Sequence, residues 1–242
     1  GPAARGGGTG GPPGRPRRTG AGLRRRARGP GGASRWGRAA PAVSAVFDHL
    51  VLACETLEAG AAQAEAALGV PLEPGGAHRA FGTHNRLLSL GPGAYLEAIA
   101  VDPQAPPPGR PRWFDLDRFA GPPRLTAWVV RVPDLAAAAA AGLASGEILD
   151  LERGRTRWRM AVPADGVLPR DGLHPAAIEW RGPHPADALP DLGCRLARLV
   201  LRHPRPAALA GLPGADDPRV TVERGPPGVS ARIDTPAGPR WL

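Results

Sequence analysis

A strand-like segment with a glutamate at the same position occurs twice in this chain, and this repetition restricts the possible folds. The first copy is Ala94–Ala98 and the second is Ala176–Trp180. Glu97 of the first copy follows His49 of an earlier apolar run by 48 residues. Glu179 of the second copy follows Ala127, taken as the counterpart of His49, by 52 residues. Internal repeats of this kind determine architecture before any single motif does. The chain is therefore interpreted as a duplicated unit.

Two polar residues interrupt the strands of the first unit. His49 lies within the apolar run Phe47–Ala53, and Glu97 lies between Leu96 and Ala98. A carboxylate that is buried without a partner costs on the order of several kcal/mol, so Glu97 needs a cation, a hydrogen-bond donor or a metal. An imidazole on a neighbouring strand would serve this purpose. The alternatives are a core histidine bonded to a backbone carbonyl and a glutamate on an exposed strand face.

The first unit has the pattern of a strand, a helix and a hairpin. Thr56 is a typical N-cap for a helix over Leu57–Leu68, and Gly69 is a typical residue at a helix C-terminus. The prolines and glycines of 71–80 predict a turn-rich loop. The predicted strands are 43–53, 84–90 and 94–101, of which the last two form a hairpin around the turn 91–93.

The same order returns in the second half of the chain, after a Pro-rich connection at 103–123. The predicted elements of this half are a strand at 125–132, an Ala-rich helix from Pro133 to Leu143, and strands at 158–162 and 176–180. A shorter third unit has a strand at 194–202, a short helix at 206–212, and a hairpin of strands 220–223 and 229–234. Strands that alternate with single helices and hairpins indicate a mixed sheet.

The predicted fold is therefore α+β, with two βαβββ modules at 43–102 and 124–182 and a partial third βα-hairpin unit at 193–242. Residues 1–42 are rich in Arg, Gly and Pro and contain few apolar residues. Such a segment cannot bury enough surface to offset the entropy of ordering, so we expect it to be a disordered tail.

The net charge of +9 originates in this tail, which has ten arginines and no acidic residue. The other 200 residues have 21 arginines and 22 acidic residues, a balance that does not favour binding to nucleic acid. Only the tail could contact nucleic acid or an anionic surface, through counterion release. The chain has no lysine, and the simpler explanation of its arginines is the codon bias of a GC-rich, bacterial genome.

Cys54 and Cys194 are 140 residues apart and form no metal-binding spacing. Their apolar neighbours are typical of buried free thiols, and one disulfide is the alternative. No apolar run approaches the roughly 20 residues that a transmembrane helix needs, and the N-terminus lacks the apolar centre of a signal peptide. We therefore expect a cytoplasmic protein with a small-molecule ligand or substrate, without membrane contact, and with the option of a homodimer.

Taken together, these motifs resemble the glyoxalase-like domain of the vicinal oxygen chelate superfamily. The resemblance covers residues 45–182 and rests on six segments: Asp48–Val51, Leu68–Val70, Pro74–Gly76, Gly82–Leu88, Tyr95–Glu97 and Ile178–Trp180. In that superfamily each βαβββ module curls into half of an open mixed-sheet barrel, and two modules enclose a cavity. The resemblance therefore implies a barrel with a small-molecule site inside it.

The family pattern also implies a metal site, with ligands on the first and last strands of each module. Carried over to this chain, it implies His49 and Glu97 from the first module and Glu179 from the second. Ala127 or Trp128 stands at the fourth position, where neither can ligate a metal. A histidine with two carboxylates suits Fe(II), Mn(II) or a similar divalent ion, with Zn, Ni and Mg as the other candidates. Glu97 and Glu179 are also the candidate catalytic groups for moving a proton.

Substrate contacts are expected from residues near the barrel mouth and from large aromatic side chains: His84, Asn85, Trp113, Trp128 and Trp158. Trp180 is a further candidate for lining an apolar pocket. The alternative for His84 and Asn85 is a turn with local hydrogen bonds, and for the tryptophans it is an ordinary core. Three further histidines precede prolines and are predicted to lie in surface turns: His174, His184 and His203.

Two functions are compatible with this sequence. The first is a metal-dependent enzyme of isomerase, lyase or dioxygenase type, in which a divalent ion chelates two oxygens of a small oxygen-rich molecule. The second is a metal-free protein that binds and sequesters a small apolar or aromatic molecule, which the missing ligand in the second module favours. The sequence contains neither a P-loop nor the Gly-x-Ser-x-Gly motif of serine hydrolases.

Overall fold

The computed structural model describes residue 8, residues 10 and 11, and residues 44–242. The disordered tail that the sequence predicts at 1–42 lies outside the described residues, apart from those three positions. All elements of secondary structure belong to the compact unit Pro41–Leu242.

Two βαβββ modules share one eight-stranded sheet. The first module contains β1 (Val46–Ala53), α1 (Leu57–Leu68), β2 (Glu73–His78), β3 (Thr83–Ser89) and β4 (Tyr95–Val101). The second contains β5 (Arg124–Arg131), α2 (Leu135–Ala140), β6 (Glu147–Arg153), β7 (Thr156–Val162) and β8 (Ala176–Trp180). The short 3-10 helices η1 (Trp113–Asp115) and η2 (Pro185–Ala188) lie in the connections after β4 and β8.

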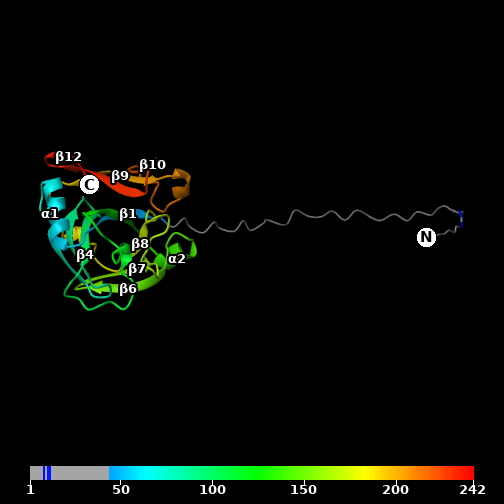
Figure 1. Ribbon diagram of the computed structural model, residues 1–242, viewed down its shortest axis with the longest axis horizontal. Coiled ribbons are helices and arrows are strands. Elements are labelled where there is room, and N and C mark those ends of the chain that lie inside the picture. The colour runs from blue at the N-terminus through cyan, green and yellow to red at the C-terminus, as the bar shows by residue number, and fades with distance from the viewer. Residues whose placement is uncertain (1–7, 9, 12–43) are drawn as a thin grey trace, which may run out of the picture. The chain divides into compact units, whose positions relative to one another are not determined.

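The strand order of this sheet is β2-β3-β4-β1-β5-β8-β7-β6. The first and last strands of each module, β1 with β4 and β5 with β8, pair in parallel. The modules are joined where β1 pairs antiparallel with β5. The sheet curls until its two end strands, β2 and β6, approach each other (Figure 1). The predicted α+β fold, with two βαβββ modules in an open mixed-sheet barrel, is confirmed.

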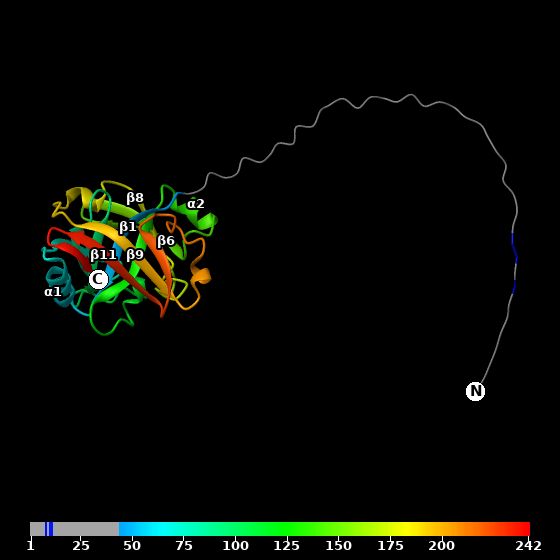
Figure 2. The same ribbon diagram turned by 90° about the horizontal axis from the view of Figure 1, so that it is seen from above.

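A second sheet, formed by the C-terminal residues, covers the outer side of β5 (Figure 2). Its strands are β9 (Arg195–His203), β10 (Val220–Arg224), β11 (Gly228–Thr235) and β12 (Gly238–Trp241), and the 3-10 helix η3 (Pro206–Leu209) follows β9. The predicted hairpin of 220–223 and 229–234 is wrong, because β9 lies between β10 and β11. Two consecutive prolines between β10 and β11 lack N–H donors, which disfavours a tight hairpin turn. The hairpin partner of β11 is β12, which was not predicted.

Helix α1 begins and ends as the sequence predicts. Thr56 Oγ1 accepts a hydrogen bond from the Ala59 N–H at 3.2 Å, which satisfies one free donor of the first turn. Gly69 adopts φ +74°, and its N–H donates to the Glu65 carbonyl at 2.8 Å. Helix α2 is capped by the Asp134 side chain, which accepts a hydrogen bond from the Ala137 N–H. It ends at Ala140 and not at the predicted Leu143, shortly before Gly142, which has a φ of +73°.

Two strands of the barrel were missed in the sequence. The predicted loop at 71–80 contains β2, an end strand whose pairing with β3 is irregular between Pro74 and Gly76. Proline and glycine are tolerated there because an end strand has one unpaired side and can contain a bulge. The other end strand, β6, alternates acidic and apolar residues and is mostly half-buried or exposed, so it also lacked the apolar character of a central strand.

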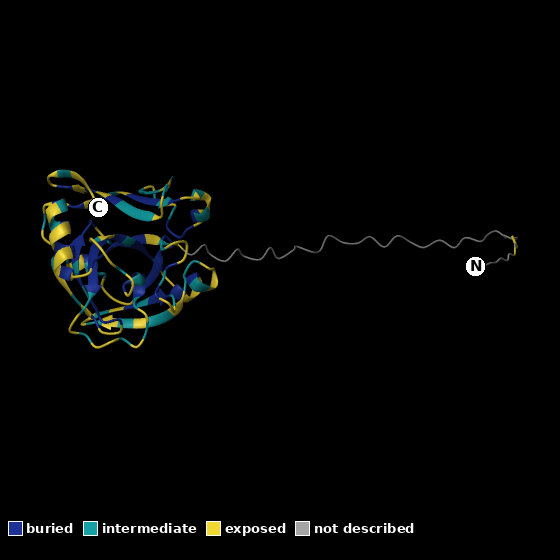
Figure 3. Cartoon of the chain, viewed as in Figure 1, coloured by how far each residue is buried: buried dark blue, intermediate teal, exposed yellow. Residues whose placement is uncertain are grey.

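The two faces of the barrel sheet carry separate cores. Figure 3 shows that much of the barrel sheet is buried. The outer face packs against both helices and the second sheet, and its centre includes Leu50, Trp128 and Leu199. The inner face encloses a second cluster that includes Val51, Trp113 and Ile178. Because successive side chains of a strand point to opposite faces, neighbouring residues of β1 such as Leu50 and Val51 belong to different cores.

Both cysteines are buried and unpaired. Burial raises the pKa of the Cys54 thiol to about 12, so this group is protonated at neutral pH. Burial also raises the pKa of Cys194. None of the helices in the described part of the chain has the length and apolar character needed to cross a bilayer.

We expect Gly60→Ala to destabilise the protein, although alanine normally stabilises a helix by about 1 kcal/mol relative to glycine. A Cβ at residue 60 would lie 2.3 Å from Cys54 Sγ, because α1 packs closely against the end of β1. Overpacking of this kind costs about 1–3 kcal/mol. Urea denaturation should therefore show a lower unfolding free energy for Gly60→Ala. Ala62→Gly, at an exposed position of α1, is the control, because it measures the ordinary preference of the helix for alanine over glycine without overpacking. A gain in stability for Gly60→Ala would contradict the close packing.

Candidate functional site

An irregularity in β1 places two polar side chains next to each other. Phe47 pairs with Val130 and His49 with Val129, so Asp48 is an extra, unpaired residue in the strand. Such a bulge redirects a side chain that would otherwise point to the opposite face. Asp48 Oδ1 lies 2.6 Å from His49 Nδ1. Because a carboxylate only accepts hydrogen bonds, Nδ1 carries the proton in this contact.

The Asp48 carboxylate is fully buried, with 0 % exposure, and is satisfied by several donors. Its Oδ2 accepts hydrogen bonds from Trp180 Nε1 and His184 Nε2, each at 2.9 Å. Burial alone would raise the pKa of Asp48, but the hydrogen bonds from His184 and His49 and their charges outweigh it and hold the pKa well below its usual range. Asp48 is therefore a buried anion that fixes His49 and His184 in place.

The other ring nitrogen of His49 is directed at Glu97. His49 Nε2 lies 3.6 Å from Glu97 Oε2, and the imidazole stacks on Tyr95 with ring centroids 4.4 Å apart. Glu97 Oε1 accepts a hydrogen bond from Asn85 Nδ2 at 2.5 Å. The structure therefore brings together three residues that the sequence singled out: His49 on β1, Asn85 on β3 and Glu97 on β4.

Across the gap between the end strands, Arg153 of β6 contacts His78 of β2. Arg153 Nη1 lies 3.0 Å from His78 Nε2 and 2.9 Å from Asn85 Oδ1. Because arginine only donates, His78 Nε2 is the acceptor and His78 Nδ1 carries the proton toward Thr83 Oγ1, 3.1 Å away. Burial, the charge of Arg153, and the neighbouring His49 and His84 lower the pKa of His78 from 6.5 to about 3. His78 is therefore neutral at physiological pH.

These groups line a cavity of about 30 Å³ inside the barrel. The polar side is formed by His49, His78, Asn85, Glu97 and Arg153, and the aromatic side by Tyr95, Trp113, Phe114, Trp158 and Trp180. Trp113 is 4 % exposed, and its Nε1 has no hydrogen-bond partner within the part of the chain that the structure describes. A buried N–H donor without a partner is costly, and this one is enclosed by its neighbours and not accessible from the cavity. Trp113 and Trp158 thus lie where the sequence predicted them.

Glu179 does not join this cavity. Its neighbours Ile178 and Trp180 line it, so Glu179 points to the other face of β8. There Glu179 Oε2 accepts a hydrogen bond from the Leu135 N–H at the start of α2 (2.9 Å), and Oε1 lies 2.7 Å from Arg181 Nε. The expected common site of Glu179 with His49 and Glu97 is therefore wrong, because the comparison of the two modules was shifted by one residue.

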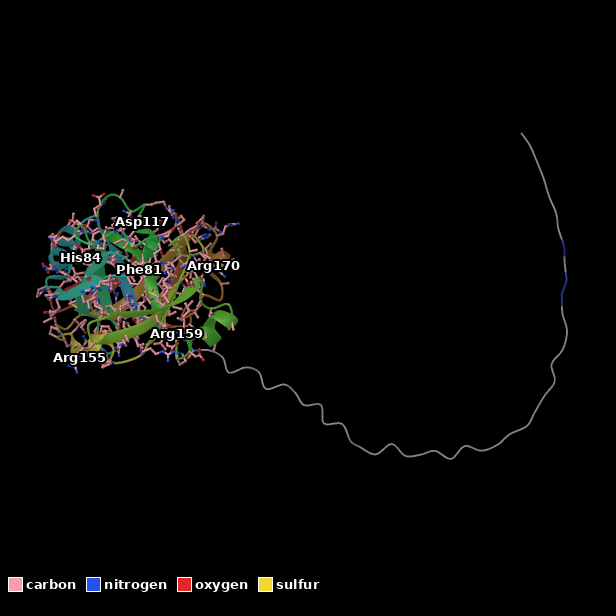
Figure 4. The ribbon with its side chains drawn as sticks, turned by 90° about the horizontal axis from the view of Figure 1, so that it is seen from below. Phe81, His84, Asp117, Arg155, Arg159 and Arg170 are labelled. Atoms are coloured by element: carbon pink, nitrogen blue, oxygen red, sulfur yellow. The ribbon has the colours of Figure 1, made fainter. Side chains whose placement is uncertain are left out.

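Two other residues that were expected to contact the substrate also lie elsewhere. Trp128 belongs to the outer core, and its Nε1 donates to the Leu173 carbonyl at 3.0 Å. His84 alternates with Asn85 along β3 and lines a shallow depression on the outside, where Figure 4 labels it at the edge of the molecule. Asn85 alone of this pair reaches the barrel cavity.

The three His-Pro histidines are not in surface turns. His174 and His203 are buried, and His203 Nε2 lies 2.9 Å from Asp171 Oδ2. His184 is half-buried and bonds to Asp48 across 136 residues of sequence. The proline after each histidine suggested a loop, which is correct for His174 and His184 but wrong for His203, the last residue of β9, and it said nothing about burial.

The sequence analysis missed six residues of the site: Asp48, His78, Tyr95, Phe114, Arg153 and His184. One signal was present in Pro74-Gly75-Gly76. A Cβ at Gly75 would lie 1.9 Å from Asn85 Oδ1, and a Cβ at Gly76 would lie 2.9 Å from Arg153 Cδ. The two glycines therefore allow β2 to approach the polar side of the cavity, and His78 follows them at the end of the same strand.

The polar side of the cavity does not meet the needs of a divalent ion. His78 Nε2 lies 3.9 Å from Glu97 Oε1, so His49, His78 and Glu97 converge. However, Arg153 and Asn85 already donate to His78 Nε2 and Glu97 Oε1, and the guanidinium charge opposes a cation there. Within residues 44–242 and the three described N-terminal positions, no group of three or more His, Cys, Asp or Glu side chains is arranged to hold a metal ion. The residues present do not fit the implied metal.

Comparison with known proteins finds one matching family and several similar structures. The sequence profile of a family described as a glyoxalase-like domain matches residues 47–213. A hypothetical protein from Staphylococcus aureus has a similar structure, with a TM-score of 0.55 and 12% identity, covering 76% of this chain and 88% of that chain. Methylmalonyl-CoA epimerase from Mycobacterium tuberculosis is 19% identical, with a TM-score of 0.39, covering 62% of this chain and 97% of that chain. None of the curated proteins matches the sequence.

We expect stability to fall below pH 6.5 because of His78. Its folded pKa of about 3 is lower than its ordinary value of 6.5, so between these values the unfolded chain binds a proton that the folded chain does not. The unfolding free energy therefore decreases as pH falls through this window, by up to about 1.4 kcal/mol per pH unit, and is constant above it. Urea denaturation from pH 7.5 to 5 should show a steeper loss for the natural protein than for His78→Gln. Equal slopes would contradict a buried, neutral His78.

Proposed function

Because this chain belongs to the glyoxalase-like domain family of the vicinal oxygen chelate superfamily, we propose that it is an enzyme that moves a proton on a small oxygen-rich molecule inside the barrel. The observation that carries this proposal is the series of contacts from Asp48 through His49 to Glu97, at the polar side of an otherwise aromatic cavity. Acid–base groups need such orientation, since proton transfer requires hydrogen-bond reach.

Asp48 and His49 act as an oriented pair. The hydrogen bond to Asp48 fixes a proton on His49 Nδ1 and directs Nε2 toward Glu97 in the cavity. His49 Nε2 and Glu97 Oε2 are only 3.6 Å apart. They therefore serve one face of a substrate and can pass a proton between them, but they cannot act from opposite faces of one carbon. This geometry favours isomerase or lyase chemistry with proton transfer on a single face.

Arg153 supplies the positive charge for a substrate oxygen. Its guanidinium has five N–H donors, of which Nη1 contacts His78 and Asn85. Trp113 adds an aromatic wall beside His78, with the ring centroids 5.0 Å apart. A compact 2-oxo acid has a carboxylate for Arg153 and acidic C–H bonds beside its carbonyl group for Glu97. In this proposal the reaction takes no step through a metal ion.

A second candidate function is binding without turnover. Five aromatic side chains line the cavity. This agrees with the usual ligand pocket, which is mostly apolar and has few polar groups. In this case Glu97 and His49 would hold the ligand by hydrogen bonds only. The two candidates differ in what happens to a substrate proton.

We expect the protein to exchange the C3 protons of pyruvate, 2-oxobutyrate or oxaloacetate for deuterium in D2O, which proton NMR can follow. Glu97→Gln and His49→Gln should lower the exchange rate by roughly 100-fold or more, the usual contribution of a general base. Glu179→Gln is the matched control, because it removes a buried carboxylate on the other face of the sheet. It should lower thermal stability and leave the exchange rate of the folded protein unchanged.

The tryptophans of the cavity provide a separate measurement of binding by fluorescence. Arg153→Met should weaken binding of the same 2-oxo acids, whereas Glu97→Gln should preserve it. Binding without exchange would favour the second candidate. Exchange that needs an added divalent ion, or that survives Glu97→Gln, would contradict the proposed mechanism.

A further inference from the structure

A second and larger cavity lies where the barrel meets the C-terminal sheet. Its volume is about 490 Å³, within the range of small-molecule sites. Four segments line it: the connection at 114–119, the start of β5 at 124–127, the loop at 167–173, and the start of β11 at 227–229. None of the polar residues of the first cavity lines it, and Phe114 is the wall that the two cavities share.

Much of the wall of this cavity is apolar. It contains two aromatic rings and several aliphatic side chains: Phe114, Phe119, Leu125, Leu168, Leu173 and Val229. Removal of apolar surface from water is the main favourable contribution when a molecule enters such a cavity. An occupant therefore needs an apolar body, such as a ring system or an acyl chain.

Two of the lining loops hold a backbone conformation that residues other than glycine seldom adopt. Phe114, Asp115 and Asp171 have φ values of +57°, +59° and +57°. Such residues cluster at ligand sites, where the surrounding structure holds them in place. Arg170, next to Asp171, donates through Nη1 to the Ala208 carbonyl, so the C-terminal part of the chain fixes one of these loops. The cavity therefore has a shape that exists before a ligand binds.

Arg124 is held at this cavity by contacts that leave its charge available. Its Nη1 donates to the Ala120 carbonyl at 2.9 Å and to the Pro122 carbonyl at 3.3 Å. Its Cζ lies 4.2 Å from the centre of the Phe119 ring. Among the residues that the structure describes, no carboxylate forms an ion pair with Arg124, and its Nε and Nη2 donate to no protein group. These two nitrogens are a pair of donors that a carboxylate can accept in a bidentate contact.

The other charged residues of the wall already have partners. Arg118 Nη2 lies 2.7 Å from Asp115 Oδ1. Asp171 Oδ2 lies 2.9 Å from His203 Nε2, and His203 Nδ1 accepts a hydrogen bond from the Arg205 N–H at 3.0 Å, so Nε2 carries a proton. Each carboxylate of the wall is thus engaged by a donor, whereas the guanidinium described above has no acidic partner. This difference favours an anionic occupant over a cationic one.

We propose that this cavity is a second ligand site, which binds an amphipathic organic anion of the aryl or acyl carboxylate class. The carboxylate pairs with Arg124, and the apolar body lies against Phe114, Leu168 and Val229. The site is separate from the proton-transfer site, so the two proposals can fail independently.

Two fluorescent dyes test this proposal, because 1-anilinonaphthalene-8-sulfonate is the anionic counterpart of the neutral N-phenyl-1-naphthylamine. The full chain should raise the fluorescence of the anionic dye in a saturable manner. Arg124→Gln should weaken its binding by roughly 5-fold or more, as expected for a lost charged hydrogen bond, and change the affinity for the neutral dye by less than about 2-fold. Arg155→Gln is the matched control, because it removes the same charge from an exposed residue between β6 and β7, away from the cavity (Figure 4).

The class of ligand is tested by displacement of the anionic dye. 1-Naphthoate should displace it at lower concentrations than the neutral 1-naphthol, and Arg124→Gln should remove this difference. Val229→Trp should fill the cavity and weaken binding of the anionic dye by at least about 10-fold. Val222→Trp, at an exposed position of β10 outside the cavity, should bind normally.

Glu97→Gln should also bind the anionic dye normally, which separates this site from the first cavity. Circular dichroism and thermal unfolding show whether each variant is folded, and Arg124→Gln still tests the site if Val229→Trp is not. Three results would overturn the proposal: no saturable binding of the anionic dye, the same affinity in Arg124→Gln as in Arg155→Gln, or an equal loss of both dyes in Arg124→Gln.

Discussion

The burial of the Asp48 carboxylate is the constraint on which the site depends. A carboxylate without water needs donors, and here they come from three separate places: His49 on the same strand, Trp180 at the end of β8, and His184 just before η2. These bonds fix the second module and the following connection against β1. The orientation of the His49 ring toward Glu97 follows from the same bonds, so packing between the modules and the chemistry of the cavity have one origin.

The two modules share a backbone plan but divide the work between them. β1 to β4 supply His49, His78, Asn85 and Glu97, whereas β5 and β8 present Val129 and Ile178 to the interior. The second module contributes mainly aromatic and aliphatic walls, together with Arg153 and the donor of Trp180. The symmetry of the fold is therefore not a symmetry of the site. One half carries the titratable groups, and the other half keeps water away from them and provides the positive charge.

The sequence predicted most of the architecture because local rules determine it. The caps of α1 at Thr56 and Gly69 need only neighbouring residues, and so does the strand pattern around Glu97. The face on which Glu179 points depends on register, where a shift of one residue exchanges the two sides of a strand. His184 meets Asp48 across 136 residues, and Arg153 meets His78 across 75. No local pattern contains such contacts, so these residues emerged only from the folded chain.

The gap between β2 and β6 has a consequence for the speed of ligand exchange. These strands end the sheet, and Arg153 bridges them to His78 and Asn85 beside a cavity of only about 30 Å³. A ligand that enters between these strands must first open this bridge, so its association rate would level off at the opening rate as ligand concentration rises. The same closure would hold a bound molecule for longer, and residence time, rather than contact area, would be the property that this barrel controls.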